Sequence, residues 1–480
     1  MLLSRASYYF SYNFLIVFLS SLVFKAFPLH GDERPNFVVI LCDDLGYGDI
    51  SCYGNKIIKT PNIDRLASQG IRFTDYYSPS PVCSPSRVGL LTGRTPNRAG
   101  IYDWIPSGTQ FHLEEKEFTI PKMLKRVGYA TCMSGKWHCN GKFNKKSQPQ
   151  PGDFGFDHWF ATQNNAAPSH RNPKNFVRNG EGVGELEGFS CRIVAEEANR
   201  WIENHVIENP DQPFFTFIAF HEPHEPISSP ESMISNYPNA QKKGEALYYA
   251  NVENMDFAVG MIMDCLNRNK VAENTLVIFT SDNGPETLNR YGGAWRSHGS
   301  PGDLRGMKLH THEAGIRVPG VMRWPLQIKA GQVSDEPVNS LDLMPTFANL
   351  AAGEIPIDIQ LDGTDIVNAF GKDEVIRKRP MFWCYYSALN KSKVALRDGN
   401  WKLLASLKSK NDKYLKIRSL NKSNYDLIKT ARLVDFELYN IGNDNDESLN
   451  LVDKNHDEFK RLSEAMRMMF DEVLKDSKIW

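Results

Sequence analysis

The segment from Cys83 to Arg94 could form a reactive site, because it places a cysteine and two arginines around a predicted helix. Its sequence is C-S-P-S-R-V-G-L-L-T-G-R. Pro85 suits the first position of a helix, where its missing N–H costs nothing, and Gly93 suits the helix end. Cys83 would then lie at a helix N-terminus, where free backbone N–H groups and the helix dipole attract an anion. An isolated cysteine is more often a small buried hydrophobic residue. In this position we expect its side chain to face a bound oxyanion.

Polar side chains follow four predicted strands, at the point where each strand ends. We expect buried strands over 36–42, 129–134, 213–220 and 276–281, because each is a short apolar run. The residues that come next are Asp43-Asp44, Gly135-Lys136-Trp137-His138, His221-Glu222-Pro223-His224 and Asp282-Asn283. Ligands of open α/β sheets bind beyond the carboxyl ends of the strands, so these side chains should meet at one edge.

The acidic and amide residues in this group form an all-oxygen set, consisting of Asp43, Asp44, Asp282 and Asn283. Oxygen donors suit Ca²⁺ or Mg²⁺, whereas zinc would call for histidine or cysteine. Either pair taken alone could instead be a turn with side-chain-to-backbone hydrogen bonds.

The basic residues at the strand ends could serve an anion. Lys136 and His138 are two residues apart, so on an extended segment both side chains face the same way. His221 and His224 lie in a proline-rich turn and could belong to a zinc site, but no cysteine or third histidine lies close in sequence to complete it. The alternative is an exposed lysine and histidines that are only hydrogen-bonded within the structure.

The elements that must position these residues alternate between strand and helix. Helices are predicted from Thr60-Pro61 to Gly70, from Thr119 to Gly128, over 190–206 and over 245–270, which indicates a largely parallel sheet covered on both faces. After about Gly371 the pattern changes to short antiparallel strands over 381–386, 392–396 and 401–404 and a helix over 453–475. We therefore predict a signal peptide (1–31), a catalytic domain (32–372) and a C-terminal α+β subdomain (373–480).

Composition restricts the partners. The formal net charge of −1, from 56 basic and 57 acidic residues, gives no global attraction to nucleic acid or to an anionic membrane. The segment 401–432 is locally basic, and it is either a solvated loop or a rim that attracts a polyanionic glycan. Of the eight cysteines, seven remain after Cys83 is set aside, so at least one should be unpaired.

The apolar run from Phe14 to Phe24 follows Arg5 and is shorter than the about 20 residues that a transmembrane helix needs. It predicts a secretory signal peptide, with an uncleaved N-terminal anchor as the alternative. The protein would then be exported to the periplasm or the extracellular space, or to the lysosome in a eukaryote, without stable membrane association.

Ordered blocks between residues 36 and 319 resemble the formylglycine-dependent (type I) sulfatases of the alkaline-phosphatase-like superfamily. The blocks include C-S-P-S-R with L-T-G-R, the strand-end groups above, and Leu304-Arg305-Gly306-Met307-Lys308 followed by Glu313 to Pro319. The resemblance implies an α/β fold with a large, mainly parallel sheet covered by helices on both faces, plus a small C-terminal α+β domain with a short antiparallel sheet. It also implies hydrolysis of sulfuric ester bonds, most plausibly in a sulfated carbohydrate.

The same resemblance assigns roles to individual residues. Cys83 would be oxidised to formylglycine by a separate formylglycine-generating enzyme, and its hydrate would attack sulfur. The metal ligands would be Asp43, Asp44, residue 83, Asp282 and Asn283, with Ca²⁺ expected and Mg²⁺ as the alternative. Arg87, Lys136 and Lys308 would neutralise the sulfate. His224 or Lys308 would protonate the leaving alcohol, and His138 would assist sulfate release.

One position departs from the family pattern, because some relatives place a hydroxyl donor near the sulfate where this chain has Asn164 and Asn165. The loop 164–188 could line a substrate cleft through Asn165, His170 and Arg178, or it could be an ordinary surface loop. Two other functions stay open at this point. One is a formylglycine-dependent phosphonate or phosphate ester hydrolase, and the other is an inactive glycan-binding homologue.

Overall fold

A computed structural model of the protein describes residues 34–371 and 374–480. The predicted signal peptide (1–31) lies outside the described residues, and so does the predicted boundary at 372–373 between the two domains. None of the helices among the described residues combines the length and apolar character that crossing a membrane requires.

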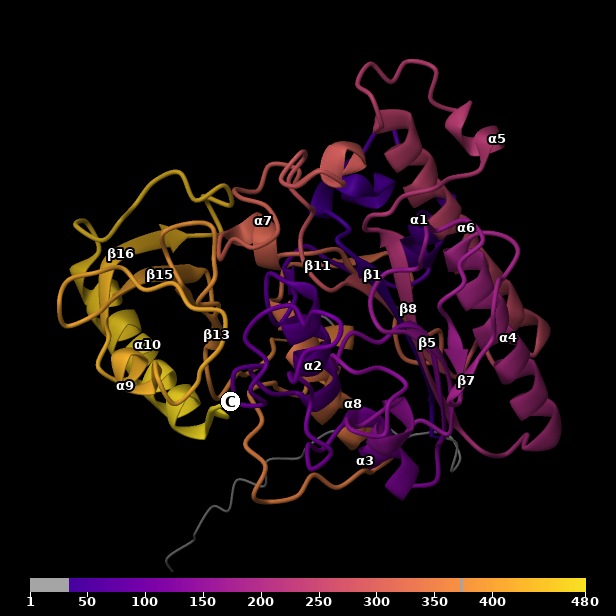
Figure 1. Ribbon diagram of the computed structural model, residues 1–480, viewed down its shortest axis with the longest axis horizontal. Helices are drawn as coiled ribbons and strands as arrows, with labels where there is room; N and C mark the ends of the chain where they lie inside the picture. Colours follow the sequence, from indigo (N-terminus) through magenta and orange to yellow (C-terminus); the bar gives the residue numbers. More distant parts are fainter. Residues whose placement is uncertain (1–33, 372–373) are drawn as a thin grey trace, which may run out of the picture. The chain divides into compact units, whose positions relative to one another are not determined.

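A ten-stranded sheet forms the centre of the structure, in the order β11-β2-β10-β9-β1-β8-β4-β5-β6-β7 (Figure 1). Its middle strands β9, β1, β8, β4 and β5 are mutually parallel, and β10 joins this group antiparallel to β9. In the register Val39 lies between Phe217 of β8 and Ile278 of β9. The bounds are β1 Asn36–Asp43, β2 Ile71–Phe73, β4 Ala130–Lys136, β5 His158–Thr162, β6 Val177–Arg178, β7 Glu181–Gly182, β8 Phe214–Pro223, β9 Thr275–Ser281, β10 Gly320–Arg323 and β11 Gln332–Ser334.

Helices cover both faces of this sheet, as the alternating signals predict (Figure 1). Alternate residues of β1 enter two different cores: Phe37 packs with α2 (Cys83–Thr92), α3 (Ile120–Arg126) and α8 (Leu343–Ala351). Val38 packs on the other face with α1 (Pro61–Ser68), α4 (Ser190–Glu208) and α6 (Glu245–Arg268). Because β1 is buried on both sides, its sequence is a continuous apolar run rather than an alternating one.

Helix ends largely follow their capping signals. The Thr119 hydroxyl accepts a hydrogen bond from the Lys122 N–H, and α2 ends at Gly93 in the left-handed region with φ of 67°. The predicted start of α2 differs slightly, since the helix begins at Cys83 and Pro85 occupies its third position. Cys83 is therefore inside the first turn.

The remaining short elements connect these layers. They are the paired strands β3 (Tyr76–Tyr77) and β12 (Val338–Asn339), the helices α5 (Glu231–Ile234) and α7 (Glu313–Ile316), and 3-10 turns at Tyr47–Asp49, Ser51–Tyr53, Pro151–Phe154, Ala294–Arg296, Ser340–Asp342 and Val367–Gly371. All eight cysteines lie in the described part, and none forms a disulfide.

The C-terminal residues form a four-stranded antiparallel sheet in the order β13-β14-β15-β16. Its strands are β13 Met381–Cys384, β14 Val394–Asp398, β15 Trp401–Lys408 and β16 Arg432–Asn440, with the helices α9 (Tyr425–Lys429) and α10 (His456–Asp476). Side chains of α10 share one apolar core with the sheet. The predicted fold class, a mainly parallel sheet with a small antiparallel C-terminal sheet, is confirmed.

Buried charges join this second sheet to the α/β part. The Asp75 carboxylate, just after β2, accepts hydrogen bonds from Arg317 and, at 2.5 Å, from Arg397 of β14. Glu313 accepts a hydrogen bond from Lys402 of β15 at 2.8 Å. Burial alone would raise the pKa of Glu313, but the charges of Lys402 and Arg317 lower it to about 2. These ion pairs lie away from water, so removing one partner would leave an uncompensated buried charge.

Candidate active site

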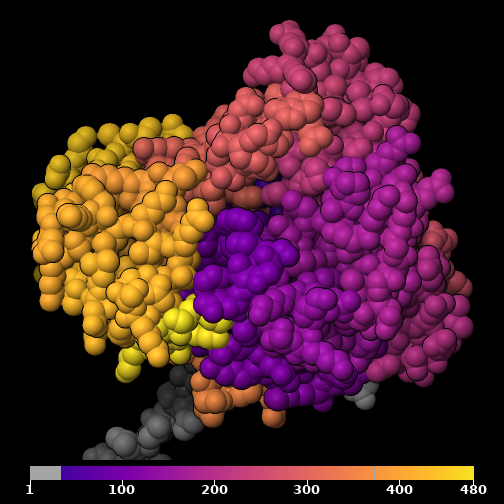
Figure 2. Space-filling model, viewed as in Figure 1, coloured from indigo at the N-terminus to yellow at the C-terminus, as the bar shows by residue number. Residues whose placement is uncertain are grey.

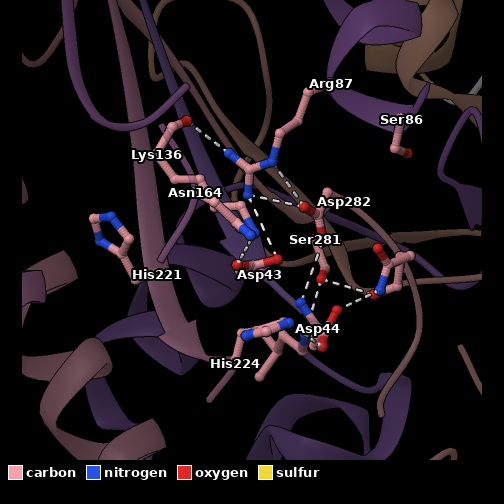
Figure 3. A network of polar contacts seen from close by, with 12 residues as sticks. Asp43, Asp44, Ser86, Arg87, Lys136, Asn164, His221, His224, Ser281 and Asp282 are labelled. Atoms are coloured by element: carbon pink, nitrogen blue, oxygen red, sulfur yellow. Dashed lines mark hydrogen bonds and ion pairs between the residues drawn. The ribbon is translucent and has the colours of Figure 1, made fainter. Parts of the chain in front are cut away.

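The strand-end residues meet as predicted (Figure 3). Strands β9, β1, β8 and β4 are adjacent and parallel, so their carboxyl ends lie at one edge of the sheet. This edge brings together Asp43, Asp44, Lys136, His224 and Asp282.

Helix α2 presents Cys83 and Arg87 to the same place. The N-cap residue Val82 provides no side-chain cap and Pro85 has no N–H, so the backbone N–H groups of Cys83 and Ser84 remain available to an anion. One turn later the fully buried Arg87 guanidinium donates to Asp282 at 2.9 Å and to the Lys136 carbonyl at 2.8 Å. Its second terminal nitrogen lies 3.7 Å from Asp43, so Arg87 bridges the two carboxylates (Figure 3).

The oxygen-rich cluster fits a hard divalent cation. Ligand atoms of Asp43, Cys83 and Asp282 lie within 4.8 Å of one another, and all three residues are buried. Asp43 Oδ1 and Asn283 Oδ1 are buried acceptors that receive no hydrogen bond from the described residues. Buried acceptors are normally satisfied, so these orphaned oxygens support a bound ion. Asp44 lies beside them and accepts a hydrogen bond from Asn283 at 2.7 Å.

Burial and charge shift the acidity of the cluster. Burial alone would raise the pKa of Asp43, but Lys136 and Arg87 among its neighbours hold it well below its usual range. Burial and the charge of Asp43 raise the pKa of Asp282 to about 7. Burial also raises the pKa of the Cys83 thiol to about 11, despite Lys136 and Lys308 nearby. At neutral pH residue 83 as encoded is thus a protonated thiol, which is a poor nucleophile and a poor metal ligand.

Two lysines contact the acidic residues of the cluster. Lys136 is fully buried and donates to Asp43 at 2.5 Å, while Lys308 donates to Asp44 at 2.7 Å. Burial would lower the pKa of Lys308, but Asp44 outweighs it and raises that pKa well above its usual range. Lys308 is therefore a permanently charged ammonium at the cavity wall.

The two histidines present free ring nitrogens. His138 Nε2 lies 3.1 Å from the Ile105 carbonyl, which can only accept, so Nε2 carries the proton and the unpartnered Nδ1 is a base. Burial, together with Lys136 and Arg87, holds the pKa of His138 well below its usual range. His224 donates from Nδ1 to the Glu225 carbonyl at 2.6 Å, and its Nε2 lies 3.6 Å from Asp44. Burial lowers the pKa of His224 as well.

Three non-glycine residues of the site have left-handed backbone conformations. They are Asp44 (φ 64°), His138 (φ 53°) and Leu309 (φ 69°). The predicted extended geometry at His138 is therefore wrong: a hydrogen bond from its backbone N–H to the Gln163 carbonyl at 2.7 Å accompanies the turn. Such strain persists only where the surroundings fix it, and it accumulates at functional sites.

A cavity of about 490 Å³ opens onto these groups. Cys83, His138, His224 and Lys308 all line it. The other lining residues are Val82, Asp103, Trp104, Asn164, Asn165, Arg290, Tyr291, Leu309, Tyr385, Ser387, Leu389, Lys416 and Arg418. Asn165 is thus placed where the sequence predicts a substrate contact.

The other two predicted substrate residues lie elsewhere. His170 is fully buried and faces the Asn251 amide at 3.1 Å. Arg178, on β6, forms two hydrogen bonds of 2.7 Å to Glu197. The described residues that line the cavity include neither. His221, which has no counterpart in the family pattern, is buried against the Thr162 hydroxyl at 2.8 Å.

Several lining residues were not anticipated. Arg290 follows β9 in a loop where Glu286, only 3% exposed, holds it through two contacts of 2.6 Å. The sequence could have indicated this position, because Glu286 and Arg290 lie in the same loop as the strand-end pair Asp282-Asn283. Trp104 carries no comparable signal, whereas Lys416 and Arg418 belong to the basic segment 401–432, for which a rim was one of the two predicted roles.

Several known proteins resemble this chain in sequence and in fold. The sulfatase family profile matches residues 35–354, and the profile of the N-sulphoglucosamine sulphohydrolase C-terminal region matches residues 307–416. Human arylsulfatase A is 35% identical over 392 residues, which covers 77% of this chain and 74% of that protein. Rat N-acetylgalactosamine-6-sulfatase is 34% identical over 376 residues, which covers 73% of this chain and 68% of that protein. The crystal structure of Ps i-CgsB in complex with k-i-k-neocarrahexaose superposes with a TM-score of 0.76 at 28% identity, covering 93% of this chain and 94% of that one.

Proposed function

Since this chain belongs to the sulfatase family, whose members hydrolyse sulfate ester bonds, we propose that it desulfates a carbohydrate through a formylglycine derived from Cys83 and a bound divalent cation. The observation that carries the proposal is the position of Cys83. It lies in the first turn of α2, within 4.8 Å of Asp43 and Asp282 ligand atoms, at the floor of a cavity lined by Lys308, His138 and His224.

Conversion of Cys83 to formylglycine supplies an aldehyde whose hydrate offers one hydroxyl to attack sulfur and a second to release the product. As encoded, residue 83 is a thiol with a raised pKa, which supports the need for this modification. A formylglycine-generating enzyme is therefore the proposed maturation partner.

The cation would be held by Asp43, Asp44, Asp282 and Asn283 together with residue 83, and Ca²⁺ suits their oxygen donors, with Mg²⁺ as the alternative. When bound, it supplies a Lewis acid that activates the attacking hydroxyl and polarises sulfate oxygens. Arg87 positions Asp43 and Asp282 through the contacts described above.

The surrounding cations would stabilise the charge on the sulfuryl oxygens. Lys308 lines the cavity with Cys83, Lys136 contacts Asp43 beside it, and the Cys83 and Ser84 N–H groups begin α2, so these donors are fixed before substrate arrives. Preorganised donors of this kind are usually the largest single contribution to catalysis.

Proton transfer is divided between two sides of the site. At neutral pH Lys308 carries a proton, whereas burial lowers the pKa of His224 and favours its neutral form, so Lys308 is the group that has a proton to donate to the departing alcohol. His224 would orient the ester. On the other side, the free Nδ1 of His138 is placed to accept the proton whose removal releases sulfate.

A carbohydrate substrate is proposed from the relatives and from the cavity. One relative is named for N-acetylgalactosamine 6-sulfate, and one solved neighbour holds k-i-k-neocarrahexaose. In this chain Trp104 (42% exposed) and Tyr291 (38% exposed) offer aromatic faces to the cavity, which suit the apolar faces of sugar rings. Together with the predicted signal peptide, this substrate class supports an exported protein.

The test is production of the full chain with a formylglycine-generating enzyme, with peptide mass spectrometry at residue 83. We expect modified protein to release sulfate from N-acetylgalactosamine 6-sulfate repeatedly, and Cys83→Ser to bind the ester without repeated turnover. Cys52→Ser, outside the cavity, is the matched control and should retain activity.

The outcomes separate the rival functions. Repeated turnover by Cys83→Ser would overturn the aldehyde mechanism. Faster hydrolysis of 4-nitrophenyl phenylphosphonate than of 4-nitrophenyl sulfate would assign a phosphonate hydrolase. Sugar sulfate binding with no hydrolysis by modified protein would assign a glycan-binding homologue.

A further inference from the structure

We propose that Lys416 and Arg418 form a subsite for a second anionic group of the substrate, next to the sulfate that is removed. The inference rests on the proposed function, because it takes the scissile sulfate to bind near Cys83. It narrows the substrate class to sugars that carry a further sulfate or a carboxylate.

Both side chains belong to a segment that the fold holds rigidly against the cavity. The segment runs from Leu415 to Leu420, between β15 and α9, and these two leucines are buried while Lys416 and Arg418 between them are exposed. Both cationic residues line the same cavity as Cys83. Two residues far from Cys83 in sequence thus line the same cavity. In Figure 2 the orange C-terminal part of the chain lies beside the indigo and purple N-terminal part.

Three hydrogen bonds fix the backbone on both sides of the two cations. The Leu415 N–H donates to the Leu407 carbonyl at 2.9 Å, and the Trp480 N–H donates to the Leu420 carbonyl at 2.9 Å. Between them, the hydroxyl of Ser387, itself a cavity residue, donates to the Ile417 carbonyl at 2.8 Å. Because this backbone is already ordered, less conformational entropy is lost when a ligand binds to Lys416 and Arg418.

Neither of these two residues forms an ion pair or a side-chain hydrogen bond within the described part of the chain. Of the other lysine and arginine residues lining the cavity, Arg290 is paired with Glu286 and Lys308 with Asp44. Among residues 34–371 and 374–480, no carboxylate oxygen lies within 4.0 Å of a side-chain nitrogen of Lys416 or Arg418, and neither side chain has a hydrogen-bond partner there.

The single acid in the cavity wall does not cancel this charge. Burial raises the pKa of Asp103 by more than the charge of Arg418 lowers it, and the Asp103 carboxylate already accepts hydrogen bonds from the Tyr385 hydroxyl at 3.0 Å and from the Trp104 N–H at 2.9 Å. Two cations facing a partly enclosed space attract an anion more strongly than they would on an open surface. The whole protein carries a net charge of −1, so this attraction is local to the cavity.

The cavity also continues past Arg418. A second hollow of about 130 Å³ shares Asp103, Trp104 and Arg418 with the first, and its other lining residues are Gly100, Ile101, Tyr102, Ile105, Pro106, Phe111 and Ser419. A substrate anchored near Cys83 therefore has room to extend along Trp104 toward Arg418. The second anionic group can lie on the same sugar or on the next one.

The experiment measures binding to the full-length Cys83→Ala protein with Ca²⁺ by isothermal titration calorimetry, so that the ligands stay intact. The ligands are N-acetylgalactosamine 6-sulfate, N-acetylgalactosamine 4,6-disulfate, and the disaccharide of glucuronate with N-acetylgalactosamine 6-sulfate. The last two distinguish a second sulfate from a carboxylate. In the same background, Lys416→Gln/Arg418→Gln is compared with Lys413→Gln/Lys422→Gln, which removes two lysine charges from the same loop outside the cavity.

We expect at least one doubly anionic ligand to bind about tenfold more tightly than the 6-sulfate, the size of one charge-assisted hydrogen bond at a partly exposed position. This ratio should fall to about one in Lys416→Gln/Arg418→Gln, persist in the control, and shrink with added salt. Equal affinities for all three ligands, or an unchanged ratio in Lys416→Gln/Arg418→Gln, would overturn the subsite. Sulfate release by the modified parent protein is measured separately, so failure of the proposed function is read from that assay alone.

Discussion

Replacing Arg87 by methionine keeps most of the side-chain volume but removes the guanidinium that bridges Asp43 and Asp282 of the proposed cation site. The guanidinium lies 2.8 Å from Asp282 and 3.7 Å from Asp43, and all three side chains are fully buried. Lys136 continues to compensate Asp43, so the loss falls mainly on Asp282.

The size of the effect follows from these distances. With an effective dielectric constant of about 20, the attractions amount to about 6 kcal/mol for Asp282 and about 4 kcal/mol for Asp43. Part of this offsets the several kcal/mol needed to remove the guanidinium from water, so the net loss in the free energy of unfolding should be about 3–5 kcal/mol. Catalysis should also fall, by about 100-fold or more in kcat/KM, because the carboxylates proposed to hold the cation lose their positioning contact.

The assay is urea denaturation at neutral pH and fixed Ca²⁺ concentration, followed by sulfate release under the same conditions. Arg467→Met, at an exposed position of α10, is the control and should change the free energy of unfolding by less than about 0.5 kcal/mol. Arg87→Lys keeps the charge without the planar fork and should fall between the two. If Arg87→Met unfolds within about 1 kcal/mol of the parent and retains its rate, the guanidinium does not organise this site and the reasoning fails.

Three further predictions concern the core, the pH response and the cation. Phe347→Ala should lower the free energy of unfolding by about 3–5 kcal/mol in urea denaturation, because its buried ring stacks on Phe37 at 4.2 Å between centroids; a loss below about 1 kcal/mol would contradict the packing. Burial, with Lys402 and Arg305, lowers the pKa of His312 in the folded protein to about 3. Between about pH 6.5 and pH 3 His312 therefore binds a proton in the unfolded chain but not in the folded protein, so the free energy of unfolding should fall as the pH drops through this range. His312→Gln should flatten that fall in pH-dependent urea denaturation, and an unchanged slope would refute this assignment. Chelation of divalent cations should abolish sulfate release and lower the melting temperature, with both recovered on adding Ca²⁺; full activity after verified removal would exclude a catalytic cation.

The site was predictable where sheet topology dictates it. Residues after parallel strands must gather at one edge, so Asp43, Lys136, His224 and Asp282 could be grouped before any coordinates were known. The fourth C-terminal strand, β16, was missed because its charged residues, such as Asp435 and Glu437, interrupt the apolar pattern at the sheet edge. Edge strands commonly carry such residues.

Contacts between segments that are far apart in the chain could not be predicted from the sequence. The left-handed turn at His138 is accompanied by a hydrogen bond to the Gln163 carbonyl. His170 was expected at a cleft but is buried opposite Asn251, 81 residues later. The sequence does not show whether the loop with Lys416 and Arg418 packs beside the cavity or lies elsewhere on the surface, so it left the role of these two residues open.

The buried ion pairs between the two sheets also limit when the fold can be completed during translation. Asp75 leaves the ribosome 322 residues before its partner Arg397, so the α/β part cannot be completed while the chain is still short. Tyr385 and Ala388, which join Cys83 in one apolar cluster, arrive equally late. Once they pack, Cys83 is only 3% exposed. We therefore expect the interval between the emergence of Cys83 and the docking of the last strands to be the period in which a maturation enzyme can reach it, so that translation speed and chaperone retention would govern how much active protein a cell obtains.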